Sequence, residues 1–454
     1  MGLDYDQARR WAKGIPNKGL IRYYMAGNIE RVIVVGSQSL SEMIGPKVYD
    51  FPKSESLRLK LERFTGNGVL LAEGDEHKMQ RRGLLPALTF RHIKDLYPIF
   101  WSKSVEMANA IEDQRQHGSK QVTIQISDWA GRATLDIIGL AVMGRDFNSV
   151  QNPNTEFHLV YTKLNMKPNM WTRLLILLSL LTCGFKMFFR LPTKWNRDSK
   201  RAANYIRRYA RKIVQDTKAR LIKGDNDHKD IASLLMSSGM FSEKNMVDQI
   251  ITFLVAGHET TAASLQWAVY ALCIHPEAQA RLHDEVRSQL ISQSDQAINA
   301  QAIDSLPYLN AFCNEVLRFY PPVPSTVREA GVDTSLAGTF IPKGTTLLIL
   351  AGVTNLEETN WGADAAEFLP ERWLARGRAN SGGADSNYAN LTFLAGSRGC
   401  IGKGFARSEL LYLVAVLVSR FRMELENLDK KLEIVRAISA APADGVIARL
   451  TSLG

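Results

Sequence analysis

The sequence is poor in cysteine, and its cysteines are scattered. Four occur in 454 residues, at Cys183, Cys273, Cys313 and Cys400, and they form neither a disulfide framework nor pairs at metal-site spacing. This usage excludes a disulfide-bonded secreted scaffold and favours a reducing, cytosol-facing location. No helix-turn-helix, zinc-finger or arginine-rich tract is evident, so we expect no nucleic-acid partner.

Membrane-spanning segments are lacking as well. The chain opens with a polar stretch, residues 4–11, which predicts a short surface helix and not a signal peptide or a transmembrane helix. The most apolar part, residues 171–191, has an apolar core of residues 174–181 that is too short to span a bilayer. Two interpretations of this part stay open: a buried helix pair, or an interfacial segment that dips into a membrane.

The remaining composition is that of a globular protein with an excess of basic residues. Hydrophobic residues make up 45% and charged residues 22%, which is ordinary for a globular fold. The formal net charge of +10 favours an anionic membrane surface or an acidic protein partner. Length alone would suggest about two or three domains.

One cysteine, Cys400, lies in a loop of small residues that spans residues 393–402. A thiolate that ligates a metal needs backbone N–H groups around its sulfur, and glycines let the backbone come that close. The predicted helix over residues 405–421 directs its positive end toward the sulfur, and Arg398 is placed to bind an anionic group of a cofactor. The glycines of this loop are Gly396, Gly399 and Gly402.

A second unusual stretch lies within the long apolar, helical pattern of residues 246–274. A glycine and a hydroxyl–acid pair in the middle of an apolar helix are costly unless they are used. We expect the small Ala256 and Gly257 to make room for a ligand against the helix. Glu259 and Thr260 can deliver protons through water to a reacting group.

Residues 393–402 closely resemble the haem-binding signature of the cytochrome P450 superfamily, and the resemblance extends from about residue 19 to the end of the chain. It implies a mainly α fold with small β-sheets, in which a single catalytic domain over residues 1–454 encloses haem b. Cys400 is then the axial thiolate, which pushes electron density onto the iron and favours O–O cleavage. Glu259 and Thr260 match the acid–alcohol pair of the helix over the haem.

The resemblance also assigns residues to the cofactor and the substrate. His77 and Arg81, which share one face of a predicted helix, are expected to contact the haem propionates, as are Arg328 and Arg398. The other expected cofactor-binding residues are Phe393, Gly396, Gly402, Ala256 and Gly257. The expected substrate-pocket residues are Phe253, Val323, Ser325, Thr326 and Ile438.

A structural role is implied for three further charged residues. Glu315 and Arg318 are three apart on a predicted helix, where such a pair at a surface is worth only about 0.2–0.5 kcal/mol. The resemblance instead implies a buried network with Arg372 that holds the loop on the haem side in place.

The implied function is that of a microsomal-type monooxygenase. It takes electrons from NADPH through a flavin-containing cytochrome P450 reductase and oxidises an apolar small molecule with O₂ in secondary metabolism, by hydroxylation or by coupling, ring closure or desaturation. We expect a monomer on the cytosolic face of the endoplasmic reticulum membrane, with the N-terminal anchor absent and this chain soluble. The acidic reductase is expected to dock on basic residues, namely Lys78, Arg82, Lys403 and Arg407.

Two alternatives stay open. One is a haem-thiolate isomerase or dehydratase that needs no O₂, although members of that type often lack the acid–alcohol pair. The other is a non-catalytic haem-binding sensor or carrier, which NADPH consumption with reductase and substrate would distinguish from an enzyme.

Overall fold

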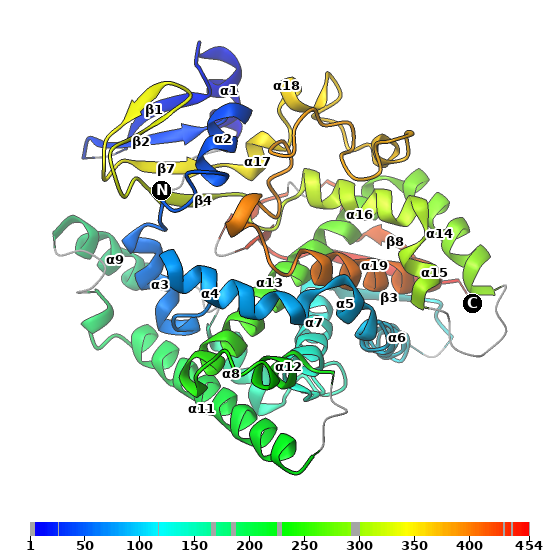
Figure 1. Cartoon of the computed structure of the whole chain (residues 1–454). Helices are drawn as coiled ribbons and strands as arrows, with labels where there is room; N and C mark the ends of the chain where they lie inside the picture. Colours follow the sequence, from blue (N-terminus) through cyan, green and yellow to red (C-terminus); the bar gives the residue numbers. More distant parts are fainter. Residues whose placement is uncertain are drawn as a thin grey trace. The chain divides into compact units, whose positions relative to one another are not determined.

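The computed structural model describes residues 5–25, 27–116, 118–164, 169–182, 188–224, 229–291, 300–429, 432–436 and 439–453. Helices predominate in it (Figure 1), so the expected mainly α fold with small β-sheets is confirmed. Two compact units are distinguished. Unit 1 comprises Met1–Pro52, Ile93–Gly131 and Glu259–Gly454, and unit 2 comprises Lys53–His92 and Arg132–His258.

The helices that lie wholly in unit 1 are α1 (Tyr5–Gly14), α2 (Ser37–Ile44), α6 (Tyr97–Glu112), α14 (Pro276–Ile291), α15 (Ala300–Asp304), α16 (Pro307–Phe319), α17 (Ala351–Thr354), α18 (Glu358–Trp361) and α19 (Lys403–Arg420), with the 3-10 helices η2 (Pro370–Trp373) and η3 (Gly396–Arg398). Those of unit 2 are α3 (Glu55–Thr65), α4 (Gly74–Leu84), η1 (Leu85–Leu88), α8 (Glu156–Leu164), α9 (Met170–Thr182), α11 (Lys194–Ile222) and α12 (Ile231–Ser237). The helices shared by the two units are α5 (Phe90–Asp95), α7 (Ile126–Met143) and α13 (Glu243–Ile274).

The strands of the described residues all belong to unit 1 and form four small sheets. The largest has the order β1 (Leu20–Met25), β2 (Ile29–Val34), β7 (Thr346–Ile349), β4 (Thr326–Glu329). Its β2 and β7 are parallel and its other pairs are antiparallel. The smaller sheets are β3 (Gln121–Gln125) with β11 (Ile447–Ser452) and β8 (Phe421–Leu425), β5 (Thr334–Leu336) with β6 (Thr339–Ile341), and β9 (Ile434–Arg436) with β10 (Ala440–Pro442).

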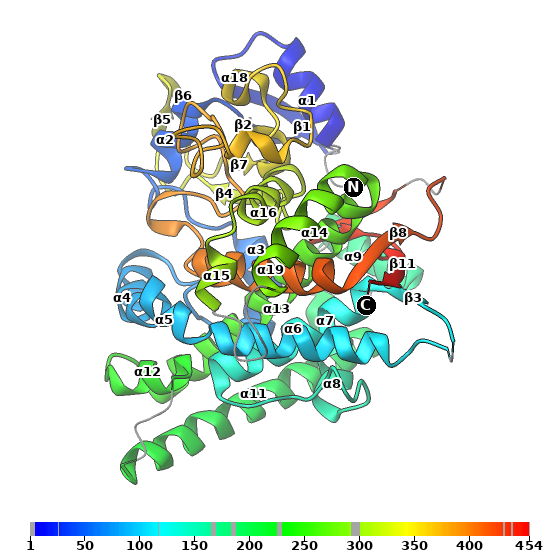
Figure 2. The ribbon, with the colours of Figure 1, turned by 90° about the vertical axis from the view of Figure 1, so that its right-hand side faces the viewer.

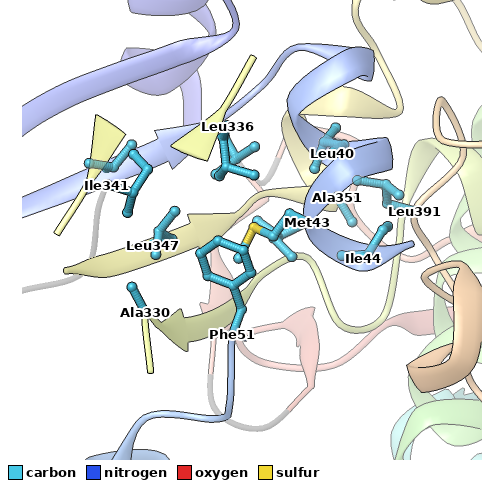
Figure 3. Close-up of a cluster of buried hydrophobic side chains, with 13 residues drawn as sticks. Leu40, Met43, Ile44, Phe51, Ala330, Leu336, Ile341, Leu347, Ala351 and Leu391 are labelled. Atoms are coloured by element: carbon cyan, nitrogen blue, oxygen red, sulfur yellow. The ribbon is translucent and has the colours of Figure 1, made fainter. Parts of the chain in front are cut away.

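A buried apolar cluster joins this main sheet to helix α2. Figure 3 shows Met43 of α2 next to Phe51, in a cluster that also contains Ile44 of α2 and Leu347 of strand β7. Each of these side chains is at most 4% exposed, and burying such a side chain is worth about 1.5–3 kcal/mol. The cluster also includes Leu391, two residues before the cysteine loop, so it fixes one side of that loop.

Helix α19 begins directly after the cysteine loop, and its residues 408–418 are all buried. It lies side by side with α6 in both views of the ribbon (Figures 1 and 2). Aromatic rings join the two helices: Phe405 meets Phe100 edge-on at 4.9 Å between ring centroids, and Tyr412 lies 5.1 Å from Tyr97. This packing holds the start of α19, and with it the position of Cys400.

Among the described residues, no helix is long and apolar enough to cross a membrane. Helix α9 is nevertheless strongly apolar, and several of its large apolar side chains are exposed: Met170 is 78% and Trp171 72% exposed, and Leu174 and Leu178 are more than half exposed, whereas Thr172 and Ser179 are buried. These exposed side chains favour the interfacial segment over the buried helix pair for this helix. Residues 183–187 lie outside the described part of the chain.

Candidate functional site

The loop that precedes α19 has a fixed backbone conformation around Cys400. The Cys400 amide donates to the Phe393 carbonyl oxygen at 2.7 Å. Gly396 has a φ of +68°, and a Cβ there would collide with the Ile44 carbonyl oxygen, so both conformation and space require glycine. Gly402 differs: its φ is −88°, and a Cβ would lie 4.0 Å from the Cys400 sulfur, an ordinary contact that would occupy space beside the thiol.

The described cysteines differ in accessibility. Cys400 is exposed, whereas burial raises the pKa of Cys273 to about 12 and raises that of Cys313 further. The thiols of Cys273 and Cys313 therefore stay protonated and inert at neutral pH. Cys183 lies outside the described residues. Lys403 lies near the thiol of Cys400: burial and the Arg407 charge lower the Lys403 pKa, and Cys400 opposes them.

Two of the basic residues assigned to the cofactor line the same small cavity. Arg328 of β4 and Arg398 of η3 both face it, together with Ile44, Phe51 and Leu394. Both arginines are buried: Arg328 is 5% and Arg398 9% exposed. Arg328 donates to the Thr326 hydroxyl at 2.7 Å. Two guanidinium groups at one apolar cavity suit a ligand with two carboxylates, which is the chemistry of the haem propionates.

His77 and Arg81 lie on helix α4 of unit 2. His77 is 3% exposed and Arg81 is half-buried, and their spacing of four residues places both on one face of the helix. The exposed acidic residues of the first turn, Asp75 and Glu76, suit the positive end of the helix.

The residues around the acid–alcohol pair on α13 differ in their exposure and in their packing. Ala256 is exposed, although the five residues before it on α13 are buried. Gly257 packs against α7, because a Cβ there would lie 2.5 Å from Ile138 Cδ1. Close helix packing thus accounts for Gly257, and its role in making room for a ligand stays a prediction. Glu259 and Thr260 are adjacent and half-buried.

The expected substrate-pocket residues also differ in their burial and in their hydrogen-bond partners. Phe253 is buried on α13 at 9% exposed, and Val323 is half-buried. The Ser325 hydroxyl lies 3.0 Å from the Tyr5 hydroxyl, which donates to it, and the Thr326 hydroxyl accepts from an arginine of its own strand. Both hydroxyls thus accept a hydrogen bond from the protein, and their place in the substrate pocket stays a prediction. Ile438 lies outside the described residues.

Glu315, Arg318 and Arg372 form one buried network in unit 1. Glu315 and Arg318 are 0% exposed and pair through two hydrogen bonds of 2.7 and 2.8 Å. Arg372 donates to the same carboxylate at 3.1 Å, and Trp373 adds a bond of 2.9 Å. A buried ion pair is stable only when further hydrogen bonds satisfy its remaining polar atoms. Arg318 meets this condition with bonds to the carbonyl oxygens of Asn355, Ala365 and Glu367.

Sequence reasoning missed the residues that connect this network to the cysteine loop. Asn355 donates to the Thr392 hydroxyl at 2.8 Å and accepts from the Leu391 amide at 2.7 Å. Thr392 in turn donates to the Leu317 carbonyl oxygen at 2.7 Å. Because these partners are 36 to 75 residues apart, no local pattern could reveal them.

A second missed group lies in unit 2, where the loop after α3 binds α13. Asp248 accepts from the Asn67 amide at 3.1 Å and from Arg207 at 2.7 Å. Gln249 accepts from the Val69 amide at 3.0 Å. These bonds hold the loop against the N-terminal half of α13, two turns before Ala256.

Comparisons with known proteins agree with this geometry. A family described as Cytochrome P450 matches residues 18–444. The cytochrome P450 monooxygenase sphH of Aspergillus fumigatus is 46% identical over 449 residues, which cover 98% of this chain and 83% of that protein. The cytochrome P450 monooxygenase FSL4 of Gibberella zeae is 41% identical over 435 residues, covering 93% of this chain and 78% of that protein.

The family match spans the cysteine loop, α13 and the buried network, and both relatives are named as monooxygenases. The chain therefore belongs to the cytochrome P450 family, and it is a monooxygenase whose cofactor is a haem bound through a cysteine thiolate.

Proposed function

We propose that Cys400 is the axial ligand of the haem iron and that Arg328 and Arg398 bind the haem propionates. When bound, the haem supplies the activation of O₂, because thiolate ligation favours O–O cleavage. Phe393 and Gly396 fix the loop that presents the thiol, and Gly402 keeps space beside it. The roles of His77 and Arg81 at the propionates, and of residues 1–454 as one catalytic domain, stay predictions from the family resemblance.

The observation that carries this proposal is the accessibility of one thiol. Cys400 is exposed at the N-terminus of a buried helix, whereas Cys273 is half-buried with a raised pKa and Cys313 is buried. The positive end of α19 favours a thiolate at Cys400. Arg398, two residues earlier, lines the cavity that also holds Arg328, so one loop carries both the iron ligand and a propionate contact.

The proposal is tested by replacing single cysteines. Cys400→Ser should abolish the red-shifted absorption band of the reduced carbon monoxide complex, since a serine supplies no thiolate. Cys273→Ser is the matched control and should keep the full band. A full band in Cys400→Ser, or a loss confined to Cys273→Ser, would contradict the assignment.

Protons are handled by Glu259 and Thr260. Both side chains are half-buried on consecutive positions of α13, so they can hold a proton near the reacting atoms and exchange it with solvent. General acid–base groups typically contribute about 10²–10⁴-fold in rate. Thr260→Ala should therefore release more hydrogen peroxide per NADPH consumed while keeping the carbon monoxide band.

The substrate is an apolar small molecule of secondary metabolism, and Phe253, Val323 and Ala256 contribute to its pocket. Support comes from the apolar character of these side chains and from the fungal relatives. The same residues suit hydroxylation, coupling, ring closure or desaturation. A spin-state change of the haem on titration with candidate apolar compounds would identify the class, and a response to charged polar compounds only would contradict it.

The electron donor is an acidic flavoprotein reductase fed by NADPH, which docks by charge. Lys403 is exposed and Arg407 is half-buried, so Lys403 is the more accessible of these two expected docking residues. Lys78 and Arg82 are exposed on α4. Lys403→Glu should slow reduction of the enzyme by the reductase, and the effect should weaken at high salt because exposed charges are screened within about 8 Å. An unchanged rate would exclude Lys403.

The chain binds the cytosolic face of the endoplasmic reticulum membrane through helix α9. Its exposed Met170, Trp171 and Leu174 suit insertion into the boundary between headgroups and acyl chains, and the basic net charge of +10 suits anionic lipids. Sedimentation with anionic vesicles should fall for Trp171→Ser with Leu174→Ser. Equal sedimentation of the variant and the parent would exclude α9 as the contact.

A further inference from the structure

Trp267 lies in the part of α13 that belongs to unit 1, seven residues after Thr260. Seven residues make almost two helical turns, so the two side chains lie on the same face of the helix, about 10 Å apart along its axis. Trp267 is 2% exposed. The groups that contact its ring therefore lie beyond Thr260 along one face of α13.

The indole N–H of Trp267 is bound to a segment that is distant in the sequence. It donates to the Ala440 carbonyl oxygen at 2.9 Å, across 173 residues. The Ala440 amide in turn donates to the Pro322 carbonyl oxygen at 2.7 Å. Ala440 belongs to β10, and Pro322 follows α16, so one indole connects α13, β10 and the chain after α16.

The ring of Trp267 holds the same region by stacking. Tyr320, the residue that follows α16, lies parallel to it, with 4.6 Å between ring centroids and 3° between ring planes. Tyr270 of α13 meets both rings edge-on, at 86° and 89°. Aromatic pairs favour both arrangements. The chain at residues 320–322 is thus held to α13 by stacking and, through Ala440, by hydrogen bonds.

This region leads directly to residues of the pocket and of the cofactor cavity. Val323, which follows Pro322, is half-buried. Strand β4 begins at Thr326 and carries Arg328, which lines the cavity near Arg398. Proline fixes its own φ and restricts the residue before it, so the Pro-Pro pair at residues 321–322 is stiff. A displacement of Pro322 is therefore passed on to Val323.

We propose that Trp267 is a positioning residue of the substrate pocket. Its ring and its N–H fix the backbone at residues 320–323 and at β10, and thereby determine which apolar groups the pocket accepts. This inference rests on the proposed function, because the place of Val323 in the pocket is part of that proposal. Trp267 acts through Val323, since its own N–H is bonded within the protein.

The proposal is tested on the haem-loaded enzyme with imidazole and 1-octylimidazole as probes. Each binds haem iron through a nitrogen and shifts the main absorption band to the red, but only 1-octylimidazole has an apolar tail that must fit the pocket. Trp267→Phe keeps a ring for Tyr320 and loses the N–H. It should weaken 1-octylimidazole binding by about 2- to 10-fold, the worth of one neutral hydrogen bond, and leave imidazole binding unchanged.

Trp361→Phe is the matched control. Trp361 is also buried, at 5% exposed, and its indole N–H donates to the Ala389 carbonyl oxygen at 3.3 Å. This variant should bind both probes as the parent does. Unchanged 1-octylimidazole binding in Trp267→Phe, an equal loss for the two probes, or the same loss in Trp361→Phe would overturn the proposal.

Hydrogen exchange measures the connection itself and does not depend on the iron ligand. Opening of the bond from Ala440 to Pro322 exposes the amide to exchange, so peptides that contain Ala440 should exchange faster in Trp267→Phe. Tyr320→Leu, which removes the stacking from the other side, should act in the same direction and should also weaken 1-octylimidazole binding. Unchanged exchange in both variants would overturn the proposal.

The two proposals can fail separately. If Cys400→Ser kept the carbon monoxide band, the iron ligand of the proposed function would be wrong, whereas exchange at Ala440 would still report on Trp267. If Trp267→Phe speeded exchange and left 1-octylimidazole binding unchanged, the connection would not position the pocket, and the inference would be wrong while the assignment of Cys400 stands.

Discussion

Two fully buried acids of unit 1 have opposite surroundings. Glu315 on α16 accepts hydrogen bonds from Arg318, Arg372 and Trp373, whereas Glu409 on α19 has no hydrogen-bond partner among the described residues. Both are 0% exposed, so burial alone does not decide the charge of a carboxyl group. Cations and hydrogen-bond donors keep a buried carboxylate ionised, and without them the acid takes up a proton.

The largest effect is expected when Glu315, the acid with several hydrogen-bond partners, is removed. Glu315→Ala should lower the free energy of unfolding by about 3–5 kcal/mol, because two arginines stay buried without their carboxylate. Urea unfolding of the haem-loaded protein measures this, together with the haem content after purification. Glu371→Ala is the control: its exposed ion pair with Arg281 spans 2.8 Å, and surface pairs contribute about 0–1 kcal/mol. Equal losses in the two variants would mean that the Glu315 network carries no special stability.

A smaller test removes one polar group from the surroundings of each acid. Trp373→Phe deletes the indole hydrogen bond to Glu315, and bonds to charged groups contribute about 1.5–3 kcal/mol. Thr261→Val deletes a buried hydroxyl that has no hydrogen-bond partner among the described residues, so we expect a loss below about 0.5 kcal/mol, the lower end for a bond between neutral groups. Urea midpoints should therefore fall further for Trp373→Phe. The reverse order would show that Glu409, and not Glu315, holds the greater charge.

The smallest test follows stability against pH. Burial raises the pKa of Glu409 in the folded protein, so above its unfolded value of about 4.3 the folded state binds the proton more tightly. Its contribution to stability is complete below that value and is lost as pH rises through the folded pKa. Between the unfolded and the folded pKa, the free energy of unfolding of Glu409→Gln, which cannot ionise, should therefore rise relative to that of the parent by up to about 1.4 kcal/mol per pH unit.

Urea unfolding at a series of pH values provides the measurement, with Glu426→Gln as the control that should follow the parent. A constant difference between Glu409→Gln and the parent across the whole range would contradict a raised pKa. If Glu409→Gln instead became more stable than the parent as the pH falls, the pKa of Glu409 would be lowered and not raised by folding.

The cysteine loop could be predicted from the sequence because its determinants are adjacent. Cys400, Arg398 and Gly396 lie within five residues, and the helix that follows shows its period directly. The pairing of Glu315 with Arg318 is also local, since three residues make less than one helical turn. In the same way, the Glu259–Thr260 pair needs only its place in an apolar helix to be noticed.

Interactions between distant residues were decided by the tertiary structure alone. The cavity shared by Arg328 and Arg398, the link from Asn355 to Thr392, and the burial of Glu409 near Thr261 each join separate elements. Glutamate on a helix gives the same sequence signal whether it faces solvent or the interior. The sequence therefore determined the family, the thiolate and the acid–alcohol pair, whereas only packing determined which acids are ionised, because the free energy of a charge depends on what surrounds it.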